Sequence, residues 1–209
     1  MAYPTVSAPY GFQPINRQDG MPYAGATTQY PITSVSTAIY NGDLVNITTG
    51  GVVKSTVTDT SVITVANQAN VTAGVFMGCQ YVNTQGQTVQ AQYYPGNAAA
   101  TTAIAYVVDD SMAAFKAAVT YSGNSTVTTT TNNAVGTNAA LIQGTGSATT
   151  GDSAVSVSQP AAGYGNATAL PVRIVATVPE TASGNNAFTE VIVKLNNPQI
   201  ISTTGNDFA

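Results

Sequence analysis

The residue types that carry out most protein chemistry are scarce in this chain of 209 residues. It contains no histidine, which excludes Ser–His and Cys–His activation of a nucleophile as well as histidine-based metal sites. The one cysteine, Cys79, stands in an apolar run and is expected to be a small core residue. Asp109 and Asp110 are adjacent but lack the spacing of a calcium-binding loop, so we expect them at a turn or strand end.

Other patterns that could support catalysis are absent or incomplete. The nine acidic residues are scattered and give no sign of two carboxylates that face one cleft, as glycoside hydrolysis requires. The run Gly144-Thr145-Gly146 lacks the third glycine and the following helix of a dinucleotide-binding loop. We therefore predict no catalytic, cofactor-binding or metal-binding residues, and we expect a protein that is not an enzyme.

The composition suggests a structural role. Charged residues make up only 7% of the chain, far below the share of about 25% that is usual in globular proteins. Such neutral surfaces are typical of fibres and viral shell components. Because the five lysines and arginines occur singly, we expect no nucleic-acid binding. We also expect synthesis in a cytoplasm and no membrane binding, since the sequence has neither a signal-peptide pattern nor an apolar run of the ~18–20 residues that cross a membrane.

Runs of β-forming residues, separated by turn residues, predict the fold. Asn41-Gly42 lies between two such runs and predicts a hairpin, because both residues tolerate a positive φ. Asn83-Thr84-Gln85-Gly86 predicts another. Just before it, alternation predicts a strand with four side chains on one face: Val75, Met77, Cys79 and Tyr81.

The segment TAIAYVVDDSMAAFKAAVTYSG fits two local structures. Asp110 or Ser111 could cap an alanine-rich helix. Alternatively, Phe115, Val119 and Tyr121 share one face of a strand, and we predict a strand because its surroundings are rich in β-formers. Hardly any long helical pattern remains elsewhere. The sequence therefore predicts an all-β protein, with a sandwich or barrel-like domain.

Residues 11–32, GFQPINRQDGMPYAGATTQYPI, combine prolines, glycines and tyrosines without the apolar period of a helix or strand. They predict an extended N-terminal arm over residues 1–36, ahead of a β domain over residues 37–209 with Thr/Asn/Gly-rich loops around 122–150. The alternative is that this arm folds back on its own domain.

The low charge also bears on association. Exposed strand edges usually rely on lysines and other charges to resist pairing with another chain. We therefore expect the edges to be covered in a homo-oligomer, a trimer first and a dimer second, or in a larger shell. A tightly closed monomeric barrel is the alternative.

The chain resembles a family of tailed-phage virion proteins, of the kind found in cyanophages and other marine phages. The resemblance is carried by five segments: GFQPINRQDGMPYAGATTQYPI, AIYNGDLV, GVFMGCQYVNTQGQTV, AYVVDDSMAAF and VIVKLNNPQI. Ser111 stands where the family has proline after the two aspartates. The resemblance implies a bacteriophage head component and no active-site residues.

Size and composition narrow this expectation to a capsid decoration (cement) protein. We expect it on the virion exterior, bound to the major capsid protein, after synthesis in the host cytoplasm. The arm is expected to place anchoring side chains in grooves of that partner: Phe12, Pro14, Arg17, Tyr23 and Tyr30. The alternative is a receptor- or glycan-binding module of a head fibre or tail.

Overall fold

The computed structural model of the chain describes residues 6–33, 37–56, 72–96, 102–121, 125–126, 134–159, 170–181 and 188–196. These residues form strands and one short 3-10 helix, η4 (Pro179–Thr181), which confirms the predicted all-β fold. Within these ranges, no helix has the length and apolar character needed to span a membrane. The strands are β1 (Gln13–Arg17), β2 (Thr28–Pro31), β3 (Leu44–Thr48), β4 (Gly51–Lys54), β5 (Gly74–Val82), β6 (Thr88–Ala91), β7 (Ala103–Val108), β8 (Ala113–Tyr121), β9 (Ser125–Thr126), β10 (Asn138–Ala139), β11 (Leu141–Ile142), β12 (Ser156–Gln159), β13 (Val172–Thr177) and β14 (Glu190–Leu195).

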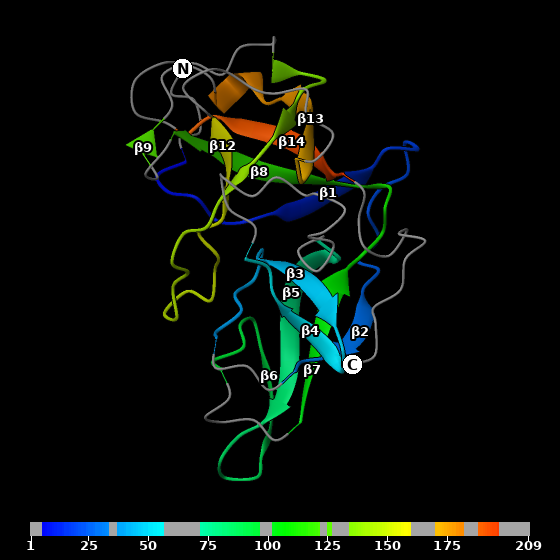
Figure 1. Cartoon of the computed structure of the whole chain (residues 1–209), viewed down its shortest axis with the longest axis vertical. Helices are drawn as coiled ribbons and strands as arrows, with labels where there is room; N and C mark the ends of the chain where they lie inside the picture. Colours follow the sequence, from blue (N-terminus) through cyan, green and yellow to red (C-terminus); the bar gives the residue numbers. More distant parts are fainter. Residues whose placement is uncertain are drawn as a thin grey trace.

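The strands form two sheets, which occupy the upper and lower halves of Figure 1. The larger sheet has the order β10-β13-β14-β8-β12-β11, and β1 and β9 also pair with β8. Only Ala140 separates β10 from β11, and its carbonyl oxygen accepts the amide of Ser158 on β12 at 2.9 Å. The two ends of this sheet therefore meet along residues 138–142, and the sheet curls into a barrel.

The smaller sheet has the order β2-β7-β5-β3-β4, with β6 paired to β5. Just after β2, Ile32 forms a parallel bridge with Val52 of β4, and the Thr33 amide donates to the Val52 carbonyl at 3.2 Å. These contacts bring the two ends of this sheet together as well. When the two ends of a sheet meet, its outer strands are covered by the chain itself and are protected from pairing with another chain. This protection compensates for the scarcity of charged residues on the strands.

Each sheet has its own hydrophobic core. Phe12 and Phe115 are fully buried in the core of the larger sheet, where their rings pack edge to face with centroids 6.4 Å apart. Tyr94 is buried in the core of the smaller sheet, which also contains Cys79. Leu44 comes from a strand of the smaller sheet but belongs to the core of the larger one, so the two cores adjoin.

The single-face alternation predicted for residues 75–82 is wrong, because β5 contains a β-bulge. Its register against β7 shifts between Phe76 and Gly78. Val75 and Met77 therefore pack with the core of the larger sheet, whereas Cys79 and Tyr81 pack with the core of the smaller sheet. The extra residue moves every later side chain to the opposite face. In this way one strand contributes to both cores.

The hairpin predicted at Asn41-Gly42 is also wrong, since these residues precede β3 instead of joining two paired strands. Gly42 does have a positive φ, of 88°. Its amide donates to the Phe76 carbonyl at 2.8 Å, and its carbonyl accepts the Phe12 amide at 3.0 Å. A Cβ at this position would lie 2.9 Å from the Phe12 nitrogen. The glycine therefore permits a close approach between distant segments.

The predicted strand in the ambiguous segment is confirmed as β8, and β1 lies beside it. Phe115 and Lys116 of β8 pair both with β1 and with β14, so β1 and β14 occupy its two opposite edges. Further on, β2 pairs with β7 in the smaller sheet. The described part of the predicted arm, residues 6–33, thus belongs to both sheets. This corrects the division into an arm over 1–36 and a domain over 37–209, in favour of a segment folded back on the domain.

Tyr10 fastens the start of this segment to the last described strand. Its hydroxyl donates a hydrogen bond to the carboxylate of Glu190, which also lies 3.1 Å from Lys116 Nζ. Burial, together with the hydrogen bond and charge of Glu190, raises the pKa of Tyr10 well above its usual value. The hydroxyl therefore stays protonated and serves as a donor.

A buried ion pair fixes the start of β3. Asp43 is fully buried, and its carboxylate lies 3.0 Å from Lys54 Nζ at the end of β4. The same carboxylate accepts the Ser153 hydroxyl at 2.6 Å and the Tyr40 amide at 2.8 Å. Asp43 thus joins the smaller sheet to the segment that leads into β12 of the larger one.

The buried thiol gives a first testable prediction. Burial raises the pKa of Cys79 to about 12, and the reactive form of a thiol is the thiolate. We expect the folded protein to resist thiol-specific reagents at mildly alkaline pH, and to react completely in concentrated guanidinium chloride. Because the pKa is higher in the folded than in the unfolded chain, this group stabilises folding below about pH 9, and that stabilisation is lost as the pH rises toward 12. Rapid labelling of the folded protein would contradict the buried placement.

Candidate interaction surface

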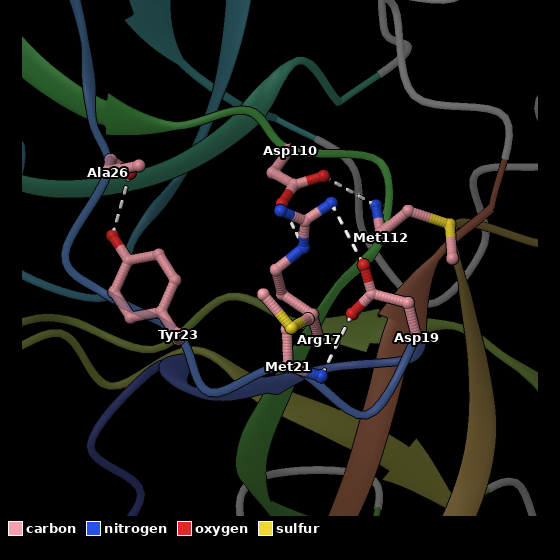
Figure 2. A network of polar contacts seen from close by, with 7 residues as sticks. All are labelled: Arg17, Asp19, Met21, Tyr23, Ala26, Asp110 and Met112. Atoms are coloured by element: carbon pink, nitrogen blue, oxygen red, sulfur yellow. Dashed lines mark hydrogen bonds and ion pairs between the residues drawn. The ribbon is translucent and has the colours of Figure 1, made fainter.

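Two connections between the sheets run side by side, and they form the candidate site drawn in Figure 2. One leads from β1 to β2, and the other leads from β7 to β8. The Gln18 amide of the first connection donates to the Met112 carbonyl of the second at 2.9 Å. The first connection is itself closed by the Arg17 amide, which donates to the Met21 carbonyl at 3.0 Å.

The adjacent carboxylates of Asp109 and Asp110 hold different strands at this junction. Asp109 accepts hydrogen bonds from the Thr28 and Tyr30 hydroxyls of β2, at 2.9 and 2.7 Å. Asp110 lies 3.2 Å from Arg17 Nε at the end of β1, in an ion pair whose angle does not make a hydrogen bond. The expected position at a turn or strand end is confirmed, because the two aspartates directly follow β7, and they also connect the two sheets.

Both connections contain the same local motif, an aspartate followed two residues later by methionine. The Asp19 carboxylate accepts the Met21 amide at 3.1 Å, and the Asp110 carboxylate accepts the Met112 amide at 2.9 Å. Asparagine and aspartate commonly fix turns through such hydrogen bonds. Arg17 lies between the two motifs, because its Nη2 is also 3.3 Å from Asp19. Exposed pairs of this kind stabilise a fold only weakly, so their main effect here is to orient the turns.

These turns present two methionines to solvent. Met21 is 59% exposed and Met112 is 38% exposed, although apolar side chains of this size are usually buried. Beside them, Tyr23 packs partly against the core of the larger sheet and donates its hydroxyl to the Ala26 carbonyl at 2.8 Å. We call this site the junction surface and define it by six residues: Arg17, Asp19, Met21, Tyr23, Asp110 and Met112.

The junction surface combines features of a protein-binding site. Methionine adapts its shape to a partner, and methionine, tyrosine and arginine are enriched in interfaces. The turns that carry the two methionines are fixed in advance, which lowers the entropy lost on binding. Within the described residues, no group of histidine, cysteine, aspartate or glutamate side chains could hold a metal ion.

Burial and nearby charges keep the tyrosines of this region protonated. Burial and the charges of Asp110 and Asp109 raise the pKa of Tyr23. For Tyr30, burial and the hydrogen bond to Asp109 raise the pKa to about 12. Both hydroxyls therefore remain hydrogen-bond donors to groups of the chain itself across the physiological range.

The five residues predicted as partner anchors fall into different environments. Arg17 and Tyr23 belong to the junction surface, whereas Pro14 lies in β1 opposite Phe115 and Tyr30 lies in β2. Phe12 has no exposed surface, because it fills the core of the larger sheet. Its role as an anchor on a partner is therefore corrected to a role in the core.

The sequence prediction missed Met21 and Met112. The signal that could have found them is the repeated pattern of aspartate, any residue and methionine, in RQDGM and in DDSM. Each copy alone is unremarkable, and their proximity depends on the pairing of β1 with β8.

No family model, no curated protein and no solved structure matches this chain.

Proposed function

We propose that this chain is a non-enzymatic virion structural protein, a capsid decoration (cement) protein that binds the outside of the major capsid protein shell and stabilises it. A protein that binds the assembled shell but not free subunits stabilises the shell by mass action. At a free concentration of ~100 times the dissociation constant, this contributes about 2.7 kcal/mol per site. The proposal includes action as a homo-oligomer, a trimer first and a dimer second.

One observation carries the proposal. Two of the segments that resemble the phage family, residues 11–32 and 105–115, are far apart in the sequence and meet at the junction surface. Each contributes one exposed methionine on a fixed turn. Exposed methionines of this kind suit close packing on a neighbouring protein, and the three charged residues beside them, Arg17, Asp19 and Asp110, are already paired with one another.

The test is binding to empty capsids assembled from the major capsid protein of the same virus. Deletion of residues 1–36 is unsuitable, because it removes β1, β2 and the core residue Phe12. We therefore choose the double variant M21S/M112S, which alters two exposed side chains. Removal of two apolar interface side chains is expected to weaken binding by at least about tenfold.

Co-sedimentation with capsids measures this effect. The matched control is Q85S/Q90S, which changes two exposed residues near the β5–β6 turn and should bind as the wild type does. Circular dichroism should give the same melting temperature for all three proteins. If wild-type protein stays in the supernatant at every capsid concentration, the decoration role is refuted.

A further inference from the structure

The chain contains five basic residues, and three of them are neutralised by carboxylates of the chain itself. The pairs are Arg17–Asp110, Lys54–Asp43 and Lys116–Glu190, at 3.2, 3.0 and 3.1 Å. The other two are Arg173 and Lys194, and no carboxylate of the described residues lies within ion-pair distance of either. Among the described residues, Arg173 and Lys194 are therefore the two cations without a carboxylate partner.

Arg173 and Lys194 stand directly opposite each other on β13 and β14. Opposed residues of an antiparallel pair point to the same face, so two positive charges lie side by side. Both side chains point away from the core, because their neighbours Ile174 and Val193 are fully buried. Like charges in this arrangement destabilise a sheet. Among so few charged residues, the arrangement is conspicuous.

Two exposed apolar side chains lie on β13 and on the turn beside it. Val175 of β13 is 38% exposed and follows Arg173 by two residues, at a shift in the strand register. The turn that carries Val135, 44% exposed, is hydrogen-bonded to the residue before Val175, since the Gly136 amide donates to the Ile174 carbonyl at 2.8 Å. We call these four residues the β13 surface: Val135, Arg173, Val175 and Lys194.

Arg173 is exposed and Lys194 is half-buried on this outer side of the larger sheet. Both charged groups therefore lie on the face of β13 and β14 that is turned away from the core.

We propose that the β13 surface binds carboxylate side chains of the partner protein, in a segment that is acidic and partly apolar. This inference rests on the proposed function, and the partner is the capsid shell. Charge complementarity supports it, because two opposed cations gain most from an anion placed between them. A nucleic acid fits less well, since two cations neutralise few phosphates and the net charge of −4 repels a polyanion.

The test compares R173Q/K194Q with the wild type in capsid binding at low and at raised salt. We expect the double variant to bind at least about tenfold more weakly at low salt and to lose most of the salt dependence, since screening acts on charge pairs. The charge-preserving variant R173K/K194R should retain both affinity and salt dependence. Equal affinity and equal salt dependence of wild type and R173Q/K194Q would overturn this inference while leaving the decoration role intact. Failure of the wild type to bind capsids would overturn the decoration role and this inference with it.

Two further measurements address other occupants. In the first, binding to a single-stranded DNA oligonucleotide is compared with binding to capsids. If the wild type bound the oligonucleotide more tightly than capsids, and R173Q/K194Q lost that binding, the cations would be assigned to nucleic acid and the proposal would be overturned. Without capsids, R173Q/K194Q should melt at the same or a higher temperature, because mutual repulsion is removed. Asp59 and Asp207 are the two acidic residues outside the described ranges. If R173Q/K194Q melted at a lower temperature and D59N/D207N reproduced this loss, the cations would pair with the chain's own carboxylates, and the proposal would be overturned.

Discussion

Replacement of Phe12 by alanine is expected to lower the free energy of unfolding by about 3–5 kcal/mol, the usual range for removal of a buried phenylalanine ring. Phe12 has no exposed surface, and its ring packs against Phe115 with an angle of 73° between the ring planes. Its backbone amide is also bound to Gly42 at 3.0 Å. The cavity would therefore open where β1 and β8 of the larger sheet meet the start of the smaller one. A loss of this size is a large part of the stability of most domains.

Urea denaturation of F12A and wild type, followed by tyrosine fluorescence and circular dichroism, measures this loss. The control is M21A in the same segment, which shortens an exposed side chain and should change stability by less than about 0.5 kcal/mol. If F12A were as stable as M21A, the N-terminal segment would not be packed into the core as described. Should F12A fail to fold, the conservative variant F12L should show a smaller loss that can be measured.

Replacement of Asp43 by asparagine is expected to cost about 3 kcal/mol, because it leaves the Lys54 ammonium without its counter-charge in a buried site. The ammonium of Lys54 lies 3.0 Å from the carboxylate and its side chain is only 16% exposed. Asparagine keeps the volume of the side chain, so the loss of stability reflects the lost carboxylate and not a cavity. The Ser153 hydroxyl and the Tyr40 amide donate to different oxygens of Asp43. In asparagine an NH2 group, which is not an acceptor, replaces one of these oxygens, and this adds to the cost.

The matched control is D19N, the same chemical change at an ion pair in which both side chains are 37% exposed. Exposed pairs contribute about 0–1 kcal/mol, so D19N should unfold close to the wild type. Thermal and urea denaturation at neutral pH give both differences. If D43N and D19N lost the same free energy of unfolding, burial would not increase the contribution of Asp43 to stability.

Alternation in a sequence best identifies those strands in which one face meets the core and no residue interrupts the pattern. β14 is such a strand, because Val191, Val193 and Leu195 are buried while Lys194 points outward. β5 was assigned correctly as a strand but with the wrong faces, since a bulge at Met77 leaves little local signal. Alternation detects a strand and does not detect an extra residue within it.

The N-terminal segment was harder to predict for a different reason. β1 contains Pro14 and a register shift before Asn16, so its burial has no period of two. What makes it a strand is the edge of β8, about a hundred residues later in the chain. Local sequence preferences cannot anticipate such a pairing. The junction surface was missed for the same reason, because Met21 and Met112 come together only through that pairing.

The contact of Tyr10 with Glu190 has a consequence for biosynthesis, since the two residues are 180 positions apart. At the usual ribosomal rate of about 5–20 residues per second, Tyr10 waits on the order of ten to forty seconds for its partner to be made. Until β14 emerges, one edge of β8 is unpaired along Phe115 and Lys116. Nascent chains therefore cannot finish folding in stages from the N-terminus, and prematurely terminated chains remain substrates for chaperones and proteases. Only a chain that includes β14 can complete the larger sheet and the contact between Tyr10 and Glu190.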